Sequence, residues 1–361
     1  MRFFKIQVIF WTLLVGPSSF SQTLFNDSHF HLTNYIQEGT EIETFLNDIM
    51  GDKVHRVALF GIPLQQTWSY ANSADYAPTY YLQSDAPLYY YSFTDAFIAM
   101  QYLSLNEEEQ KRFDPMITGF NPADMYAADH IERVLKTFPG VFSGIGEFTI
   151  HKEFVSSKVA GEVASLINPA LDRVLDFCAE TGLLVILHSD IDIPFQKPDQ
   201  DPVFMIQMKD LISRNPNTTI IWAHTGLGRV VHPNVSRISQ VNRVPSAFHL
   251  EMIRRAIESE DFPNLYFDIS WDEVAKYVVR SEESLKETAM LLNEFPDRFL
   301  FGTDEVAPSV QEGYLKVYNM YAPLWEMLTP ETKHLVTQGN YERLFDQANA
   351  KVREWEKSQG Y

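Results

Sequence analysis

Cysteine is nearly absent from this chain of 361 residues, in which Cys178 is the only one. A single thiol cannot form an intramolecular disulfide, so no disulfide framework supports the fold. Cys178 lies within residues 168–182, where apolar side chains recur at helical spacing. This spacing predicts a buried packing role for the thiol rather than catalysis.

Long apolar runs are also scarce, and no segment after residue 21 is continuously apolar for long enough to cross a bilayer. The run at residues 8–16 follows Arg2 and Lys5 and precedes small residues, which is typical of a cleaved secretory signal peptide. A buried N-terminal helix or a membrane anchor is the alternative. We therefore expect a signal peptide at residues 1–21, export to the periplasm or the medium, and one domain over residues 22–361.

Basic residues are few relative to acidic ones: 29 Lys and Arg stand against 48 Asp and Glu, giving a formal net charge of −19. A phosphate backbone repels such a chain, which argues against nucleic acid as a partner. Nothing in the chain after the N-terminal run indicates a membrane partner. We expect a small-molecule substrate.

Short apolar runs, separated by helical patterns, are what the chain has in quantity. The runs lie at residues 24–32, 54–62, 114–120, 141–148, 183–189, 218–226, 264–270 and 298–305. They are nearly continuous in apolar residues, which is typical of parallel strands covered on both faces. Eightfold strand–helix alternation predicts an α/β fold of the TIM-type (β/α)8 barrel class. An open doubly wound sheet is the alternative, but no glycine-rich turn follows the first run.

Two segments extend this plan. Residues 63–96 form an unusually long connection after the second strand, rich in Tyr, Pro, Asn and Ser. Long loops in compact domains are often active-site lids, although a surface flap packed on the barrel fits equally well. Residues 341–359 have helical spacing and predict an extra C-terminal helix packed outside the barrel.

Polar residues with metal-binding side chains stand at the ends of five of the predicted strands. They are His29, His31, Glu147, His188, His224 and Asp304. In a β/α barrel this rim carries the catalytic groups. His29 and His31 are two residues apart, so they share one face of a strand and can converge on one ion.

Five motifs resemble the amidohydrolase superfamily of metal-dependent barrel hydrolases: DSHFH, GIGEF, VILHSD, IIWAHTG and FLFGTDE. Their order is most similar to the branch that contains aminocarboxymuconate semialdehyde decarboxylase. The resemblance implies one divalent ion, usually zinc, held by His29, His31, His188 and Asp304. It also implies that His224 is a catalytic acid or base.

Glu147 adds a second alternative. A carboxylate at the end of the fourth strand resembles the TatD-like and binuclear members, in which it bridges two ions. The second ion would then use Glu147, His188 and His224. Alternatively, Glu147 orients a ligand histidine without touching metal. We favour contact with metal, and the number of ions stays open between one and two.

The resemblance implies a hydrolase that activates water on its metal to cleave an ester, lactone, amide or related bond. Asp304 would accept a proton from that water, and His224 would polarise a substrate carbonyl or act as an acid. A decarboxylase or other lyase acting on a small carboxylic acid is the alternative, because its metal ligands would be the same.

Four further residues are candidates near the site. Arg229 suits a substrate carboxylate or phosphate, although a structural ion pair is equally compatible with its position. Trp271, just after the seventh strand, is a candidate wall of the substrate pocket. Asp27 faces the same rim and is placed to orient a ligand, and His151 is a candidate for the pocket edge.

Overall fold

The computed structural model describes ten segments of the chain. They are residues 23–34, 38–62, 67–68, 82–83, 93–152, 155–156, 158–159, 162–191, 201–228 and 249–361. The predicted signal peptide, most of the long tyrosine-rich connection and Arg229 lie outside the described residues, so these predictions stay open.

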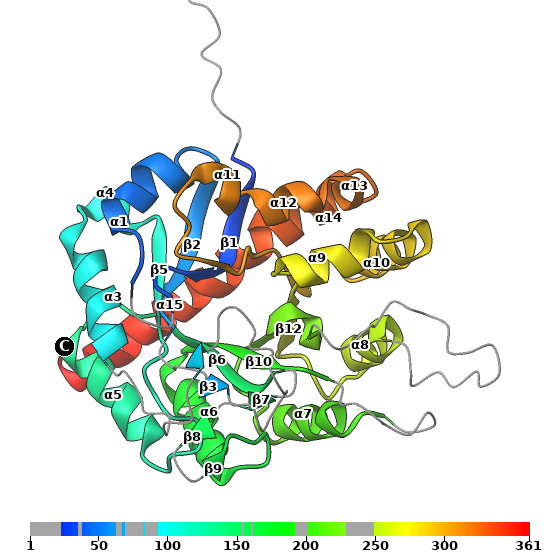
Figure 1. The fold of residues 1–361 in the computed structure, drawn as a ribbon. Coiled ribbons are helices and arrows are strands. Elements are labelled where there is room, and N and C mark those ends of the chain that lie inside the picture. The colour runs from blue at the N-terminus through cyan, green and yellow to red at the C-terminus, as the bar shows by residue number, and fades with distance from the viewer. Residues whose placement is uncertain are drawn as a thin grey trace, which may run out of the picture.

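Eight parallel strands close into a barrel (Figure 1). They are β1 (Phe25–His31), β2 (Val54–Phe60), β5 (Phe113–Ile117), β6 (Gly144–Lys152), β10 (Leu184–Ser189), β11 (Ile220–Trp222), β12 (Leu265–Asp268) and a last strand in two pieces, β13 (Phe299–Leu300) and β14 (Glu305–Val306). β13 pairs with β12 and β14 pairs with β1, so the interrupted last strand closes the sheet. The predicted barrel is confirmed, and the open sheet is wrong.

Small strands decorate this barrel. The fourth barrel strand was expected to end at residue 148 but continues to Lys152, because its end pairs with the antiparallel β7 (Val155–Ser156). Two further pairs are β3 (Thr67–Trp68) with β4 (Leu82–Gln83), and β8 (Lys158–Val159) with β9 (Glu162–Val163).

Helices surround the strands, and most of them occupy the segments with helical spacing. They are α1 (Ile42–Thr44), which continues as a π-helical turn (Phe45–Met50), α3 (Phe93–Ser104), α4 (Glu107–Gln110), α5 (Ala127–Thr137), α6 (Pro169–Thr181), α7 (Val203–Arg214), α8 (His249–Glu258), α9 (Asp272–Val279), α10 (Glu282–Glu294), α11 (Gln311–Tyr314), α12 (Lys316–Met320), α13 (Ala322–Trp325), α14 (Pro330–His334), a second π-helical turn (Leu335–Gly339) and α15 (Asn340–Gln359). The segment expected as a loop up to residue 96 already turns into α3 at Phe93.

Helix α6 illustrates why the sequence folds this way. The Asn168 side chain accepts from the backbone N–H of Ala170, Pro169 occupies the first turn, and Gly182 ends the helix with a left-handed residue. Cys178 on its inner face is buried, so the predicted packing role of the thiol is confirmed.

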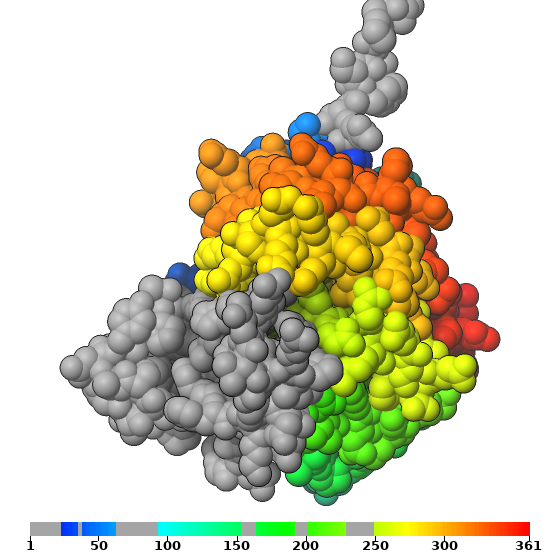
Figure 2. Space-filling view, turned by 90° about the vertical axis from the view of Figure 1, so that its right-hand side faces the viewer, coloured from blue at the N-terminus to red at the C-terminus, as the bar shows by residue number. Residues whose placement is uncertain are grey.

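The outer helices α9 to α14 form a continuous wall on one side of the barrel (Figure 1), and Figure 2 shows this wall face-on. Among the described residues, none of the helices is both long and apolar enough to span a membrane.

Helix α15 runs across the N-terminal end of the barrel (Figure 1). It does more than pack on the outside, because its apolar face completes the barrel interior. Tyr341, Leu344, Phe345 and Ala348 pack with the interior strand residues Ala58, Phe60, Met116, Leu184, Ile186, Ile221, Ala223 and Leu300. The helix therefore seals this end and leaves function to the opposite rim.

Candidate metal centre

The six ligand-type residues predicted from the sequence meet at the C-terminal rim of the barrel. His29 and His31 end β1, Glu147 lies within β6, and His188 lies near the end of β10. His224 lies two residues after the end of β11, and Asp304 lies in the gap between β13 and β14. Their side chains are between 0% and 11% exposed, so the structure brings all six into one buried cluster.

One group of ligand atoms comes from His29, His31, Glu147 and Asp304, all within 4.8 Å of one another. Nε2 of His29 lies 3.5 Å from Glu147 Oε2 and 3.4 Å from Asp304 Oδ1. Nε2 of His31 lies 3.5 Å and 3.2 Å from the same two oxygens. Two imidazoles and two carboxylates form a donor set that suits zinc and similar divalent ions.

A second group joins Glu147 to His188 and His224. Glu147 Oε1 lies 2.6 Å from Nδ1 of His188 and 3.4 Å from Nε2 of His224. The two oxygens of Glu147 therefore face different histidine pairs. Within the described residues, His188 belongs to this second group rather than to the first.

Unpartnered ring nitrogens test whether a cation fits here. Nε2 of His29 and Nε2 of His224 are buried and make no hydrogen bond to any residue that the structure describes. Buried polar atoms almost always have partners. Carboxylate oxygens face these two nitrogens at 3.4 Å or more, which is longer than an ordinary hydrogen bond. Divalent cations would satisfy nitrogens and oxygens together, so the residues fit the metal that the sequence implies.

Hydrogen bonds from behind orient the histidines. Asp268 Oδ2 lies 3.0 Å from Nδ1 of His29, and Asp190 Oδ1 lies 3.1 Å from Nε2 of His188. Ser270 Oγ lies 2.8 Å from Nδ1 of His224. In each case the other ring nitrogen faces Glu147, as in the carboxylate–histidine–metal arrangements of metal sites.

Sequence reasoning missed the two acids of this supporting set. Asp268 lies near the end of the predicted strand 264–270 and is the last residue of β12, and Asp190 directly follows the predicted strand 183–189. Both therefore had the same positional signal as the six predicted residues. Asp268 also accepts from the backbone N–H of His224 at 2.8 Å, so one carboxylate fixes residues from two strands.

Asp27 acts on the backbone behind the cluster rather than on a ligand ring. Its carboxylate accepts from the backbone N–H groups of His29 (3.0 Å) and Thr303 (2.9 Å), and from the hydroxyls of Thr303 (2.6 Å) and Tyr314 (2.9 Å). These bonds join β1 to the interrupted last strand beside Asp304. Burial raises the pKa of Asp27 to about 6 despite the four donors.

The charges of the cluster shift its acid–base equilibria. Burial alone would lower the pKa of His29, but Asp268, Glu147 and Asp304 raise it well above 6.5. Burial likewise opposes ionisation of Asp304, yet His224, His29 and His31 hold the pKa of that carboxyl well below its usual range. Asp304 is therefore a carboxylate at neutral pH.

The pKa values of the second histidine pair, His188 and His224, shift in opposite directions. Burial would lower the pKa of His188, but Glu147 and Asp190 raise it to about 8. For His224, burial outweighs the attraction of Asp304 and Glu147, so its pKa falls below 6.5. His224 is therefore neutral at pH 7, the form in which an imidazole binds metal.

Strained backbone is concentrated at this rim. His224, Thr225, Trp271, Asp304 and Ala307 have φ between 47° and 79°, in the left-handed region that non-glycine residues rarely adopt. All five follow the ends of β11, β12, β13 or β14. Such strain gathers at functional sites because the surrounding structure must hold side chains in unusual directions.

A model of the amidohydrolase family matches residues 27–347. The chain belongs to the amidohydrolase family. The matched region includes all six cluster residues, which confirms the family resemblance inferred from the motifs. The chain matches no curated protein by sequence.

Solved structures with the same fold as this amidohydrolase are distant in sequence. An uncharacterised TIM-barrel protein from Bordetella bronchiseptica has 14% identity and a TM-score of 0.53, with 90% of this chain and 99% of the other covered. A protein assigned as a 2-pyrone-4,6-dicarboxylic acid hydrolase from Pseudomonas putida has 12% identity and a TM-score of 0.50, with 90% and 98% covered. A 2,6-dihydroxybenzoate decarboxylase has 13% identity and a TM-score of 0.50, with the same coverage. At these identities the likeness establishes the fold.

Trp271 is the one predicted substrate-binding residue of this amidohydrolase that the structure describes. Its ring lies 5.1 Å from the ring of His224 and 6.4 Å from that of His188, which places it beside the cluster. His151 lies on β6 beyond Glu147 and stacks on Phe204 with 3.6 Å between ring centroids. The role of Trp271 in binding stays a prediction.

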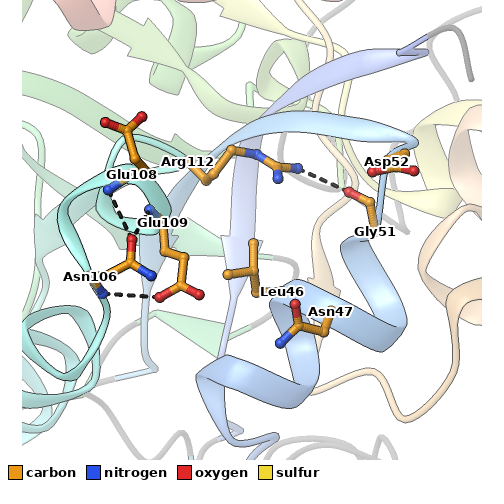
Figure 3. A pocket seen from close by; sticks show the side chains of 8 residues that line it. All are labelled: Leu46, Asn47, Gly51, Asp52, Asn106, Glu108, Glu109 and Arg112. Atoms are coloured by element: carbon orange, nitrogen blue, oxygen red, sulfur yellow. Dashed lines mark hydrogen bonds between the residues drawn. The ribbon is translucent and has the colours of Figure 1, made fainter. Parts of the chain in front are cut away.

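A surface hollow of about 330 Å³ lies elsewhere, before the N-terminal ends of β2 and β5 (Figure 3). Its polar groups bond to one another or to nearby backbone: Arg112 donates to the carbonyl oxygen of Gly51, and Asn106 and Glu109 form a capping box. The candidate metal centre of this amidohydrolase is at the other end of the barrel.

Proposed function

We propose that this amidohydrolase is a hydrolase that uses two divalent metal ions, with zinc as the first candidate, to cleave a bond of a small molecule. The bond is an ester, lactone, amide or related bond. The position of Glu147 carries the proposal, because its Oε2 faces His29 and His31 while its Oε1 faces His188 and His224. One carboxylate between two imidazole pairs is suited to bridge two ions.

Divalent ions bound here would act as Lewis acids and lower the pKa of a coordinated water from 15.7 to about 7. The chain's own residues then divide the remaining work. His29, His31 and Asp304 would hold one ion, His188 and His224 would hold the other, and Glu147 would contact both. Asp268 and Asp190 fix the ring orientations of His29 and His188.

Asp304 is the proposed proton acceptor. It is ionised at neutral pH, because three imidazoles stabilise its negative charge. Its Oδ1 faces His29 and His31, while its Oδ2 lies 3.9 Å from Nε2 of His224. The carboxylate is thus placed to take a proton from the attacking water and to pass it to the leaving group. If a single ion is bound, His224 is free to polarise a substrate carbonyl.

Chelation and reconstitution test this proposal. Purified protein is screened against esters, lactones and amides, treated with a chelator, and reloaded with zinc or manganese. We expect hydrolysis to disappear on chelation and to return with metal. Hydrolysis that persists in metal-free protein would contradict the proposal.

The same screen distinguishes the proposed hydrolase from the lyase alternative. Aromatic and aliphatic carboxylic acids are added to the library, and carbon dioxide release is measured beside hydrolysis. Release of carbon dioxide without cleavage of any ester, lactone or amide would replace the hydrolase with a decarboxylase that uses the same metal residues.

We also propose that the protein is exported after removal of residues 1–21, on the strength of the basic and apolar pattern at the N-terminus. The intact mass of protein collected outside the cytoplasm gives its first residue. A mass that begins before Gln22 would refute this cleavage site.

A further inference from the structure

Lys152 reaches across the mouth of the barrel. It is the last residue of β6, and its Nζ lies 5.3 Å from the ring centroid of Trp271, which directly follows β12. In the sheet, β10 and β11 stand between β6 and β12. These two strands carry His188 and lead into His224, so the lysine side chain spans the half of the rim that holds these histidines.

The ring under the ammonium is held in place. Trp271 is 6% exposed, and its backbone N–H donates to the carbonyl oxygen of Thr303 at 3.3 Å. The ring packs beside the imidazoles of His224 and His188. A cation over the face of an indole is attracted by the ring, so Trp271 stabilises the ammonium at this position.

The charge of Lys152 contrasts with its surroundings. The cluster residues Glu147 and Asp304 and the supporting acids Asp190 and Asp268 lie on a chain with a net charge of −19. The negative charge of the whole chain repels an anionic substrate. Lys152 supplies a compact positive charge beside the ring of Trp271, which packs against His224 and His188.

We propose that Lys152 is a specificity-determining residue that binds an anionic group of the substrate, a carboxylate or a phosphate. The site would take small molecules that carry this anion in addition to the bond that reacts. The anion lies over the His188 and His224 half, and the reacting bond lies toward Asp304. This inference deepens the proposed hydrolase and rests on its metal cluster as the place where the other end of the molecule binds.

Calorimetry with simple acids tests the inference without turnover. Zinc-loaded protein is titrated with succinate, glutarate, adipate and pimelate, each compared with the monocarboxylate of the same length. At least one diacid is expected to bind about tenfold more tightly than its partner, as for one added charge-assisted hydrogen bond. Lys152→Met should reduce this ratio to about one, and Lys152→Arg should keep most of it.

Lys276→Met is the matched control. Lys276 lies on α9, which begins beside Trp271, and it pairs with Asp272 and Glu273. Its loss removes the same charge near the rim, so a general field effect would lower the diacid preference in this variant too. We expect the preference to remain. An equal loss in both variants would overturn the assignment to Lys152.

Two other results would overturn the inference: a wild-type protein without any diacid preference, or a preference that survives in Lys152→Met. Titration with 3-phosphonopropionate distinguishes the anions, because tighter binding than that of the diacids, lost in Lys152→Met, identifies a phosphate-type group. Metal content is measured in each sample. Failure to bind zinc with a preserved Lys152-dependent preference would refute the metal hydrolase and leave the anion site standing.

Discussion

Each end of the barrel holds a group of polar side chains, and the two groups differ in how many of their buried polar atoms have hydrogen-bond partners. At the N-terminal end, the guanidinium of Arg56 donates to Asp114 through Nε (3.1 Å) and through a terminal nitrogen (2.9 Å), and a second terminal nitrogen donates to Asp346 (2.6 Å). The Tyr341 hydroxyl donates to Asp114 at 2.7 Å. We name these four residues the closed cluster.

The six residues of the candidate metal centre, here called the rim cluster, are not all paired in this way. This cluster combines two carboxylates and four imidazoles, yet ring nitrogens of His29, His31 and His224 have no hydrogen-bond partner within the described part of the chain. A buried polar group costs stability unless it is paired, so a group that is left unpaired indicates another role. The two clusters therefore differ less in composition than in whether their buried polar atoms have hydrogen-bond partners. Paired atoms indicate a structural role, and unpaired atoms indicate a binding site.

The largest expected effect is at the rim. Asp304→Asn removes the proposed proton acceptor and one ligand oxygen with little change in shape. The rate constant kcat should fall by about 10²- to 10⁴-fold, as for loss of a general base. Metal-free protein should lose some stability as well, because the depressed pKa of Asp304 means that its ionised form stabilises the folded state. A variant that keeps its turnover would remove Asp304 from the chemistry.

The opposite pattern is expected in the closed cluster. Asp114→Ala leaves the Arg56 guanidinium and the Tyr341 hydroxyl without their shared acceptor. Breaking a buried ion pair in this way costs about 3–5 kcal/mol of unfolding free energy. Urea denaturation measures that loss, and kcat at a temperature where the variant is folded should match wild type. A large fall in kcat with unchanged stability would break the comparison.

The contribution of a third buried carboxylate, Asp95, to stability depends on pH. Its oxygens accept from the backbone N–H groups of Thr118 and Gly119, and burial raises its pKa from 3.8 to about 7. The folded state therefore holds the proton more tightly than the unfolded state. This contribution to stability is complete below pH 3.8 and is lost as pH rises through about 7.

A shift of about three pKa units limits the change in unfolding free energy from Asp95 to about 4 kcal/mol. Unfolding free energies of wild type and Asp95→Asn, measured between about pH 4 and 8, isolate it from other titrations. The difference between the two proteins should change by up to that amount, with wild type losing relative stability as pH rises. A difference that does not change with pH would mean that Asp95 ionises as freely as in the unfolded chain.

The smallest expected effect concerns the Tyr341 hydroxyl, which donates from α15 to Asp114. Tyr341→Phe keeps the ring, which stacks on Phe345 at 4.1 Å, and removes only the donor to Asp114. We expect a loss of about 1 kcal/mol, because Arg56 still satisfies that carboxylate. The midpoint of urea unfolding measures it. A loss as large as that of Asp114→Ala would show that α15 depends on this bond.

Much of the fold could be predicted from the sequence, because apolar runs and helical spacing report burial directly. All eight strands and the closing helix α15 fall on the expected segments. Strand ends were less predictable. The run at 298–305 splits around Asp304, which has φ 54°, and β6 passes its expected end by pairing with β7. Both events depend on neighbours that the local pattern does not contain.

The six residues of the candidate site could be named because a barrel brings the ends of its strands to one rim. What the sequence could not provide is the partner of each atom. Asp268 and Asp190 stand at equivalent positions, and only the structure places them behind the rings of His29 and His188. The span of Lys152 to Trp271 likewise joins strands that are not neighbours in the sheet.

The central claim is that Glu147 serves two ions, and metal stoichiometry tests it most directly. Wild type, Glu147→Gln and the matched control Glu305→Gln are stripped of metal, reloaded with zinc, desalted and analysed by mass spectrometry of the metal. We expect about two zinc ions per chain in wild type and in Glu305→Gln, and one or fewer in Glu147→Gln. Absence of bound zinc in wild type, or the same content in all three proteins, would contradict it.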